Sequence, residues 1–280
     1  MLDFLTDPFA AELGQRALVS GLLAAVTMAL VGSWVVVRGL TFAGDALAHG
    51  VLPGVALAVA WGFSLHWGAL ASALVMMVGV SLARRTGRIS DDASIGLLFV
   101  GMLALGVVII SRGDAHYGNL EAILFGDVLT VSDADVQLQQ AVAVGILIAV
   151  LLLYRRLLAL SFDPRKAAVL GLQPGLTHVA LLAMLAVAVV ASFQVVGTLL
   201  VMGLMVAPPA TALLLVRKMP LVLLTSVAVG CLNVVLGLII SYHEDLAASA
   251  TVAVVAVVLF FAVAGGRGLL DLALRANHAR

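Results

Sequence analysis

The sequence predicts an all-α polytopic membrane protein with eight or nine transmembrane helices. Of its 280 residues, 63% are hydrophobic and 11% are charged, and the mean hydropathy is +1.20. A water-soluble domain of this length could not bury so much apolar surface in one core. The apolar residues fall in runs of about 20, the length that a helix needs to cross a bilayer. Basic residues follow every second run.

The chain begins with a segment that is both acidic and apolar, Met1–Arg16. This mixture predicts that residues 1–16 lie at the membrane interface as an amphipathic segment. The segment lacks the basic start of a cleaved signal peptide. The first long apolar run, Ala17–Val37, follows and ends at Arg38.

The second apolar run, roughly Asp45–Gly62, carries two polar side chains, Asp45 and His49. If the run is helical, a spacing of four places both on one face. A converging carboxylate and imidazole suit a divalent cation such as zinc or manganese. The two could instead bond each other or cap a helix. However, a charge near the bilayer centre costs at least about 2.5 to 3.5 kcal/mol on insertion scales, so such residues are usually kept for function.

Seven further runs complete nine candidate spans. The first of them follows a tight turn that carries His66. The run Leu199–Val216 is short and contains Pro208-Pro209, which predicts an interrupted helix facing protein or a watery cavity. Eight full spans with one irregular segment therefore fit the sequence as well as nine. The seven runs are Leu65–Ala83, Ala93–Ser111, Val136–Tyr154, Leu176–Val196, Leu199–Val216, Leu221–Tyr242 and Ala247–Gly265.

Basic residues predict the orientation, because Lys and Arg favour the cytoplasmic side. They gather at residues 38, 84–88, 155–166, 217–218 and 267–280, which alternate along the chain. Gly87 is therefore expected to face the cytoplasm and Gly118 the outside. Histidines and acids predominate at the outer junctions, and this suits cations delivered from outside. His243 and Asp245 are the weaker candidates for metal ligands there.

The longest cytoplasmic connection is about Arg155–Gly175. Asp163-Pro164 predicts a helix start, with Asp as the cap and Pro at the first helical position, and Gly171 predicts its end. Such a helix of about two turns could be an inert hairpin. It is also the kind of rigid element that a membrane domain needs to dock on a cytoplasmic motor.

Several function classes are excluded. The formal net charge is zero, which gives no electrostatic basis for binding nucleic acid. The sequence has neither GxxxxGK[ST] nor HExxH, which removes a P-loop ATPase and the simplest intramembrane zinc protease. The single cysteine, Cys231, rules out an intrachain disulfide.

Six sequence blocks resemble, in order, the permease subunits of bacterial zinc/manganese ABC importers (the ABC-3 type). The resemblance spans roughly residues 16–265. Any one block alone would be weak, and the agreement of all six in order makes it specific. The blocks are GDALAHGVLPGVALA, SIGLLF, NLEAILFGDVL, FDPRKAAVLG, VVGTLLVMGLMVAPPATA and SYHEDLAASA.

This resemblance implies a homodimer of BtuC-like (type II importer) architecture in the bacterial inner or plasma membrane. Residues 17–266 would be the permease domain, 155–175 its coupling segment and 267–280 a cytoplasmic tail. Asp45 and His49 would line the translocation path, while Asp163, Pro164, Ala167, Ala168 and Gly171 would contact the ATPase. Many relatives have Pro and Gly soon after the equivalent of Asp245, whereas Ala247-Ala248-Ser249-Ala250 stands here, so a role for Asp245 is not implied.

The partners implied are two separate ABC ATPase subunits, which hold ATP, an extracytoplasmic metal-binding protein, and membrane lipid. The chain itself would be no enzyme and would hold no permanent cofactor; Zn²⁺, or next Mn²⁺, would be cargo. Three alternatives stay open. They are a permease for iron, siderophore or cobalamin-type cargo, an ATP-independent secondary metal carrier, and a membrane scaffold, which would leave Asp45 and His49 without a reason.

Overall fold

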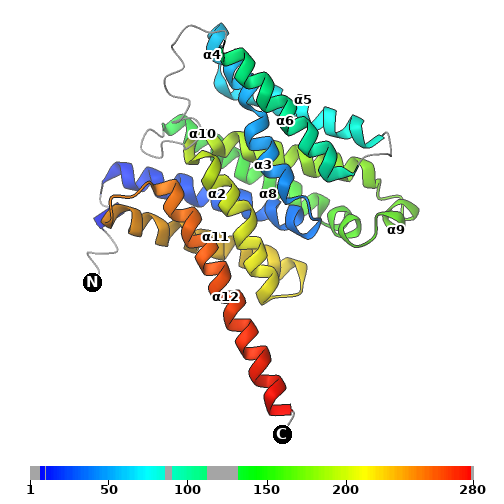
Figure 1. Cartoon of the computed structure of the whole chain (residues 1–280), viewed down its shortest axis with the longest axis vertical. Coiled ribbons are helices and arrows are strands. Elements are labelled where there is room, and N and C mark those ends of the chain that lie inside the picture. Colours follow the sequence, from blue (N-terminus) through cyan, green and yellow to red (C-terminus); the bar gives the residue numbers. More distant parts are fainter. Residues whose placement is uncertain (1–6, 10, 86–89, 112–131, 279–280) are drawn as a thin grey trace.

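The computed structural model describes residues 7–9, 11–85, 90–111 and 132–278. The block NLEAILFGDVL and both Gly87 and Gly118 therefore lie outside the described residues. Every regular element within the described ranges is helical. The elements (Figure 1) are η1 (Asp7–Phe9), α2 (Glu12–Val37), α3 (Thr41–Gly50), α4 (Leu52–Trp61), α5 (Leu65–Arg85), α6 (Asp91–Ser111), α8 (Asp133–Phe162), α9 (Pro164–Val169), α10 (Pro174–Leu215), α11 (Met219–His243) and α12 (Ala248–His278).

Nine candidate spans lie in the described part of the chain, which confirms the polytopic membrane fold. Helices α3 and α4 together make one of them, Thr41–Trp61, and α10 makes two. The first span begins at Glu12, before the expected Ala17, so the helix runs on into the segment assigned to the interface.

The core of the bundle lies between α2 and α10. Trp34 and Met28 of α2 are fully buried, as are Leu204 and Met205 of α10. The two helices approach closely because Gly32 stands at their crossing: a Cβ there would meet the carbonyl oxygen of Met205. Small residues allow such backbone approach between membrane helices.

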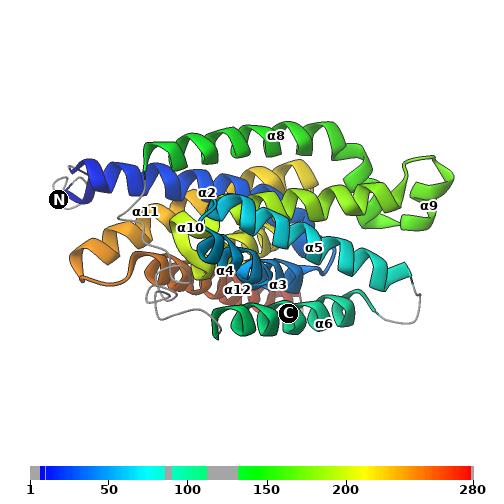
Figure 2. The ribbon, with the colours of Figure 1, turned by 90° about the horizontal axis from the view of Figure 1, so that it is seen from above.

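Contacts between helix ends fix the direction of the helices. Arg16 and Asp133, near the starts of α2 and α8, lie 3.1 Å apart, and Asp135 lies 3.9 Å from His66 at the start of α5. Helices α2, α5 and α8 therefore begin on the same side. The ribbon places α9 at the opposite end, as Figure 2 shows. Arg165 and Lys166 of α9 thus lie at the end of the bundle away from Asp133 and Asp135, which agrees with the alternation of charge along the chain.

The expected outcome of cysteine labelling follows from this arrangement. In a chain with Cys231 replaced by serine, Leu170→Cys in the turn after α9 should react with an impermeant maleimide only from the cytoplasmic side. Leu246→Cys, between α11 and α12, should react only from outside. Both side chains are exposed, so access to the reagent depends on the side of the membrane. Labelling of both from one side would contradict the orientation.

The span with the candidate ligands is broken in two. Helix α3 begins at Thr41 rather than Asp45, and α4 begins at Leu52 with Pro53 in its first turn. The break is a bend, because the Val51 amide still donates to the Leu47 carbonyl at 3.2 Å. His66 lies within the first turn of α5, and not in the preceding turn as the sequence predicts.

The predicted interruption at Pro208-Pro209 is wrong in its position. Both prolines lie inside the continuing helix α10, and the break falls at Gly197, whose φ of 78° and ψ of 161° are not helical. Glycine adopts this conformation without the strain that a Cβ would bring. Membrane helices tolerate proline when neighbouring groups satisfy the freed carbonyls. The break thus lies near the start of the second span of α10, Val195–Leu215.

The short helix α9 forms as the sequence predicts. Asp163 is its cap, with Oδ1 accepting from the amides of Arg165 at 2.9 Å and Lys166 at 3.1 Å, and Pro164 opens the helix. Gly171 follows with φ of 71°, and the Leu172 amide donates to the Ala167 carbonyl at 3.0 Å. This is the usual glycine-based helix end.

Candidate metal site

One face of α3 is only partly covered by the described residues. Thr41, Phe42, Asp45 and His49 are the residues of this helix that are not buried. At 100° per residue they fall within one stripe, which we call the open stripe. Both residues that the sequence singled out therefore lie on the same surface, as their spacing predicts.

Asp45 and His49 face each other without forming a hydrogen bond. Nε2 of His49 lies 3.6 Å from Oδ1 of Asp45, and the two side chains keep 30% and 34% of their surface exposed, respectively. The separation exceeds the 2.7 to 3.2 Å typical of an N–H···O bond. A carboxylate oxygen and an imidazole nitrogen thus stand close together on the partly exposed face of α3.

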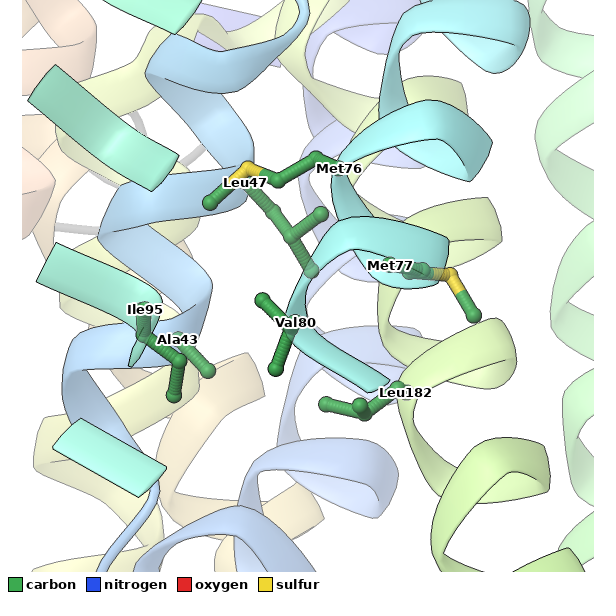
Figure 3. Close-up of a pocket in the computed structure, with 7 residues that line it drawn as sticks. All are labelled: Ala43, Leu47, Met76, Met77, Val80, Ile95 and Leu182. Carbon is green, nitrogen blue, oxygen red and sulfur yellow. The ribbon is translucent and has the colours of Figure 1, made fainter. Parts of the chain in front are cut away.

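The opposite face of α3 is packed and dry. Ala43 and Leu47 pack against α5, α6 and α10, and the gap between them measures only about 10 Å³, no more than the space of one water molecule. Figure 3 shows the side chains around this gap, none of them polar: Ala43, Leu47, Met76, Met77, Val80, Ile95 and Leu182. The apolar back of α3 therefore holds its polar front in a fixed orientation.

Three glycines bring further helices close to this region. Gly44 adjoins Asp45, and a Cβ at Gly44 would meet the side chain of Met205 on α10. Gly54 of α4 and Gly68 of α5 face each other so closely that a Cβ on either would meet the other's carbonyl oxygen. Ser72 of α5 donates to the Gly50 carbonyl at the end of α3, at 2.8 Å.

An aromatic side chain of α6 borders the open stripe. The Phe99 ring lies 5.8 Å from the His49 ring and 5.7 Å from the Phe42 ring, measured between centroids, and meets both edge to face. Sequence reasoning did not identify Phe99. It lies in the quoted SIGLLF block, but no periodicity within α6 reveals a contact with α3.

The outer-face candidates lie elsewhere. His243 ends α11, and Asp245 is exposed in the following turn with a φ of 51°. Within the described residues, no three His, Cys, Asp or Glu side chains gather closely enough to hold a metal ion. A single copy of the chain therefore offers the pair Asp45 and His49 without a third such ligand among the residues described.

The candidate coupling residues divide by exposure. Ala167 is buried within the chain itself, whereas Ala168 is exposed. A Cβ on Gly171 would meet nothing within 4 Å, so the positive φ is what requires glycine there. The sequence did not single out the apolar side chains around α9 that are most exposed: Phe162 at 82%, Val169 at 88% and Leu170 at 71%.

Comparison with known proteins gives consistent results. The family model described as "ABC 3 transport family" matches residues 10–265. The chain is 36% identical over 253 residues to a "probable iron transport system membrane protein" of Haemophilus influenzae, covering 90% of this chain and 93% of the relative. It is 33% identical over 247 residues to the "manganese transport system membrane protein MntC" of Listeria monocytogenes, covering 88% of each.

A solved structure has the same fold. The structure of PsaBC from Streptococcus pneumoniae in complex with Fab contains a chain that matches with a TM-score of 0.83 and 29% identity. The match covers 94% of both chains. The helical arrangement described above is therefore shared along nearly the whole length.

Proposed function

Since the chain belongs to the ABC 3 transport family, as a multi-pass permease subunit of the plasma membrane, we propose that it imports a divalent transition-metal ion past Asp45 and His49. The observation that carries this proposal is the open stripe: a carboxylate and an imidazole in an apolar span, on a helix that is packed from behind and partly exposed in front. Lipid is an unfavourable cover for such a pair, because a charged side chain in the bilayer costs several kcal/mol (about 2.5 to 3.5 on insertion scales).

We propose that a second copy of the chain packs against the open stripe. In a twofold homodimer the same surface faces itself, so the two open stripes would bring together two Asp45 and two His49 side chains. The nitrogen and oxygen of one copy, 3.6 Å apart, are close to the edge of a tetrahedral zinc site, about 3.4 Å for bonds of 2.0 to 2.2 Å. Both atoms can thus reach one ion with little movement.

The ligands limit the cargo to a few transition-metal ions but do not select one of them. Four ligands of Asp and His suit zinc in tetrahedral geometry, and also suit manganese. The two relatives described above are named for iron and manganese transport. We therefore propose Mn²⁺, Fe²⁺ and Zn²⁺ as the cargo candidates, and the preference for zinc stays a prediction from ligand chemistry.

The energy source would be a pair of separate ATPase subunits that dock on α9. The exposed apolar side chains Phe162, Val169 and Leu170 flank the two ends of α9, and we call them the α9 patch. Contiguous exposed apolar side chains typically mark an interaction surface. An ATP-independent carrier would have no use for this patch. An extracytoplasmic binding protein would deliver the ion on the opposite side.

Uptake measured for the three ions side by side tests the proposal. Cells that lack their own metal importers would express the permease with its ATPase and binding protein. We expect accumulation of at least one labelled ion, lost when the ATPase carries an inactive catalytic site. Accumulation no greater than in cells without the permease, for all three ions, would contradict the proposed function.

A further inference from the structure

Phe99 stands between two residues of the open stripe. Phe42 and His49 are seven residues apart, so they lie on nearly the same side of α3, about 10.5 Å apart along its axis. The Phe99 centroid is 5.7 Å from the Phe42 ring and 5.8 Å from the His49 ring. The Phe99 ring is therefore almost equally far from both rings and contacts each of them.

The geometry of α6 places the ring there. Gly96 lies one turn before Phe99, and a Cβ on Gly96 would approach only the Phe42 ring, at 3.8 Å. Gly96 and Phe99 thus share the face of α6 that meets α3. The Phe99 side chain is partly buried and packs against the hydrophobic core, so its position is determined by the bundle and not by free rotation.

The imidazole of His49 needs such a neighbour. The torsion that turns a histidine ring about its Cβ–Cγ bond is broad, with no deep wells of its own. Ligating histidines are therefore oriented by a neighbouring group, most often a hydrogen-bond acceptor on the other ring nitrogen. The contact observed for the His49 ring is an aromatic one, edge to face at 67°. Such ring pairs contribute about 0.5 to 1.5 kcal/mol beyond area burial.

We propose that Phe99 is a positioning residue for the cargo ion: it blocks rotation of the His49 imidazole and so keeps Nε2 directed toward Asp45. The inference rests on the proposed function, because it assumes that Asp45 and His49 bind the ion. Phe99 itself contributes no ligand. Its removal would leave a space beside His49 into which the imidazole could turn, so the two ligand atoms would no longer face one ion.

The test is metal affinity in the complete transporter, with Mn²⁺ and Zn²⁺ as probes. Phe99→Ala is expected to weaken binding about tenfold, the lower end of the effect seen when a group that orients a metal ligand is removed. The half-saturating ion concentration for uptake should rise by the same factor, while the maximal rate changes less than twofold. Phe99→Tyr keeps the ring and should restore affinity to within about twofold of the parent protein.

Leu97→Ala is the matched control. Leu97 lies on α6 two residues before Phe99, about 200° around the helix, and is 67% exposed. The Leu97→Ala substitution also removes an apolar side chain from α6, and it should leave the affinity for the ion unchanged. Variants are compared only where dimer and ATPase assembly match the parent on size-exclusion chromatography. If Phe99→Ala fails to assemble, Phe99→Leu replaces it, with an expected loss of affinity between those of Tyr and Ala.

Two outcomes separate this inference from the proposed function. Loss of binding in His49→Ala together with parental affinity in Phe99→Ala would overturn the positioning role alone. Parental binding in His49→Ala would overturn the proposed site itself. Equal affinity of the Leu and Tyr variants would show that volume, and not the ring, is what matters at this position, and would also overturn the role.

Discussion

Asp45→Asn and His49→Ala are each expected to reduce metal uptake at least about 100-fold, since even a residue that only orients a ligand costs about 10 to 100-fold in affinity. Asp45→Asn keeps the shape of the side chain and removes its charge, so packing of α3 should be preserved. His49→Ala removes the imidazole from a partly exposed position, and the ring contact that it loses is the one with Phe99. Uptake of the labelled ion at matched expression is the measurement.

The matched control for this experiment lies at the end of the bundle where α2 and α8 begin. Asp133 is an exposed acid that pairs with Arg16 at 3.1 Å, and exposed ion pairs contribute only about 0 to 1 kcal/mol. Asp133→Asn should therefore transport normally. The loss must occur in a protein that still inserts and assembles with its ATPase. Normal uptake in both the Asp45→Asn and the His49→Ala variant would contradict the proposal that these residues bind the transported ion.

A double substitution in the α9 patch, Val169→Asp with Leu170→Asp, is expected to abolish transport by preventing ATPase association. Both side chains are largely exposed, Val169 at 88% and Leu170 at 71%, so the permease should fold as before while two charges enter an apolar contact. Buried unpaired charges at an interface cost several kcal/mol (about 2 to 5 for a truncated pair). Co-purification of the ATPase with the permease is the measurement. Arg165→Ala, a change of an exposed charge on the same helix, should be mild.

Bulky substitutions at Ala167 of α9 and at Gly171, in the turn that follows it, should also uncouple transport, because they disturb the permease itself. Ala167 is buried in the permease, so a large side chain there disturbs the permease's own packing. Gly171→Trp places a Cβ at φ of 71°, which costs about 1 to 2 kcal/mol. If the Val169→Asp, Leu170→Asp double variant leaves both ATPase association and uptake unchanged, α9 is an ordinary hairpin. That result would favour an ATP-independent carrier.

The sequence predicts the local features of this fold well. Hydropathy places the spans, and the Asp163-Pro164 and Gly171 signals place α9, because these depend on residues near one another in the chain. The helix break predicted at Pro208-Pro209 is wrong, because membrane helices accommodate proline where neighbouring groups satisfy the backbone. The actual break at Gly197 has no comparable signal, because glycine is frequent in these spans and is compatible with helix.

The candidate site is predictable from the sequence only in part, because some of its features depend on contacts between helices that are distant in the chain. A spacing of four places Asp45 and His49 on one face of a helix whatever surrounds it. Which face of α3 is left uncovered depends on how α5, α6 and α10 pack behind Ala43 and Leu47. The contact of Phe99 with His49 joins helices that are distant in sequence. Neither the exposed face of α3 nor the contact between Phe99 and His49 can be recognised from the periodicity of a single sequence.

Counting the ions bound by the assembled transporter tests the central claim most directly. The claim is that two copies of Asp45 and His49 share one cargo ion. Equilibrium binding of Mn²⁺ and Zn²⁺ to the purified permease and ATPase complex should therefore saturate at one ion for every two permease chains. The same complex carrying Asp45→Asn and His49→Ala together should bind none at that site. Undiminished binding in the double variant, or saturation at one ion for each chain, would contradict the account.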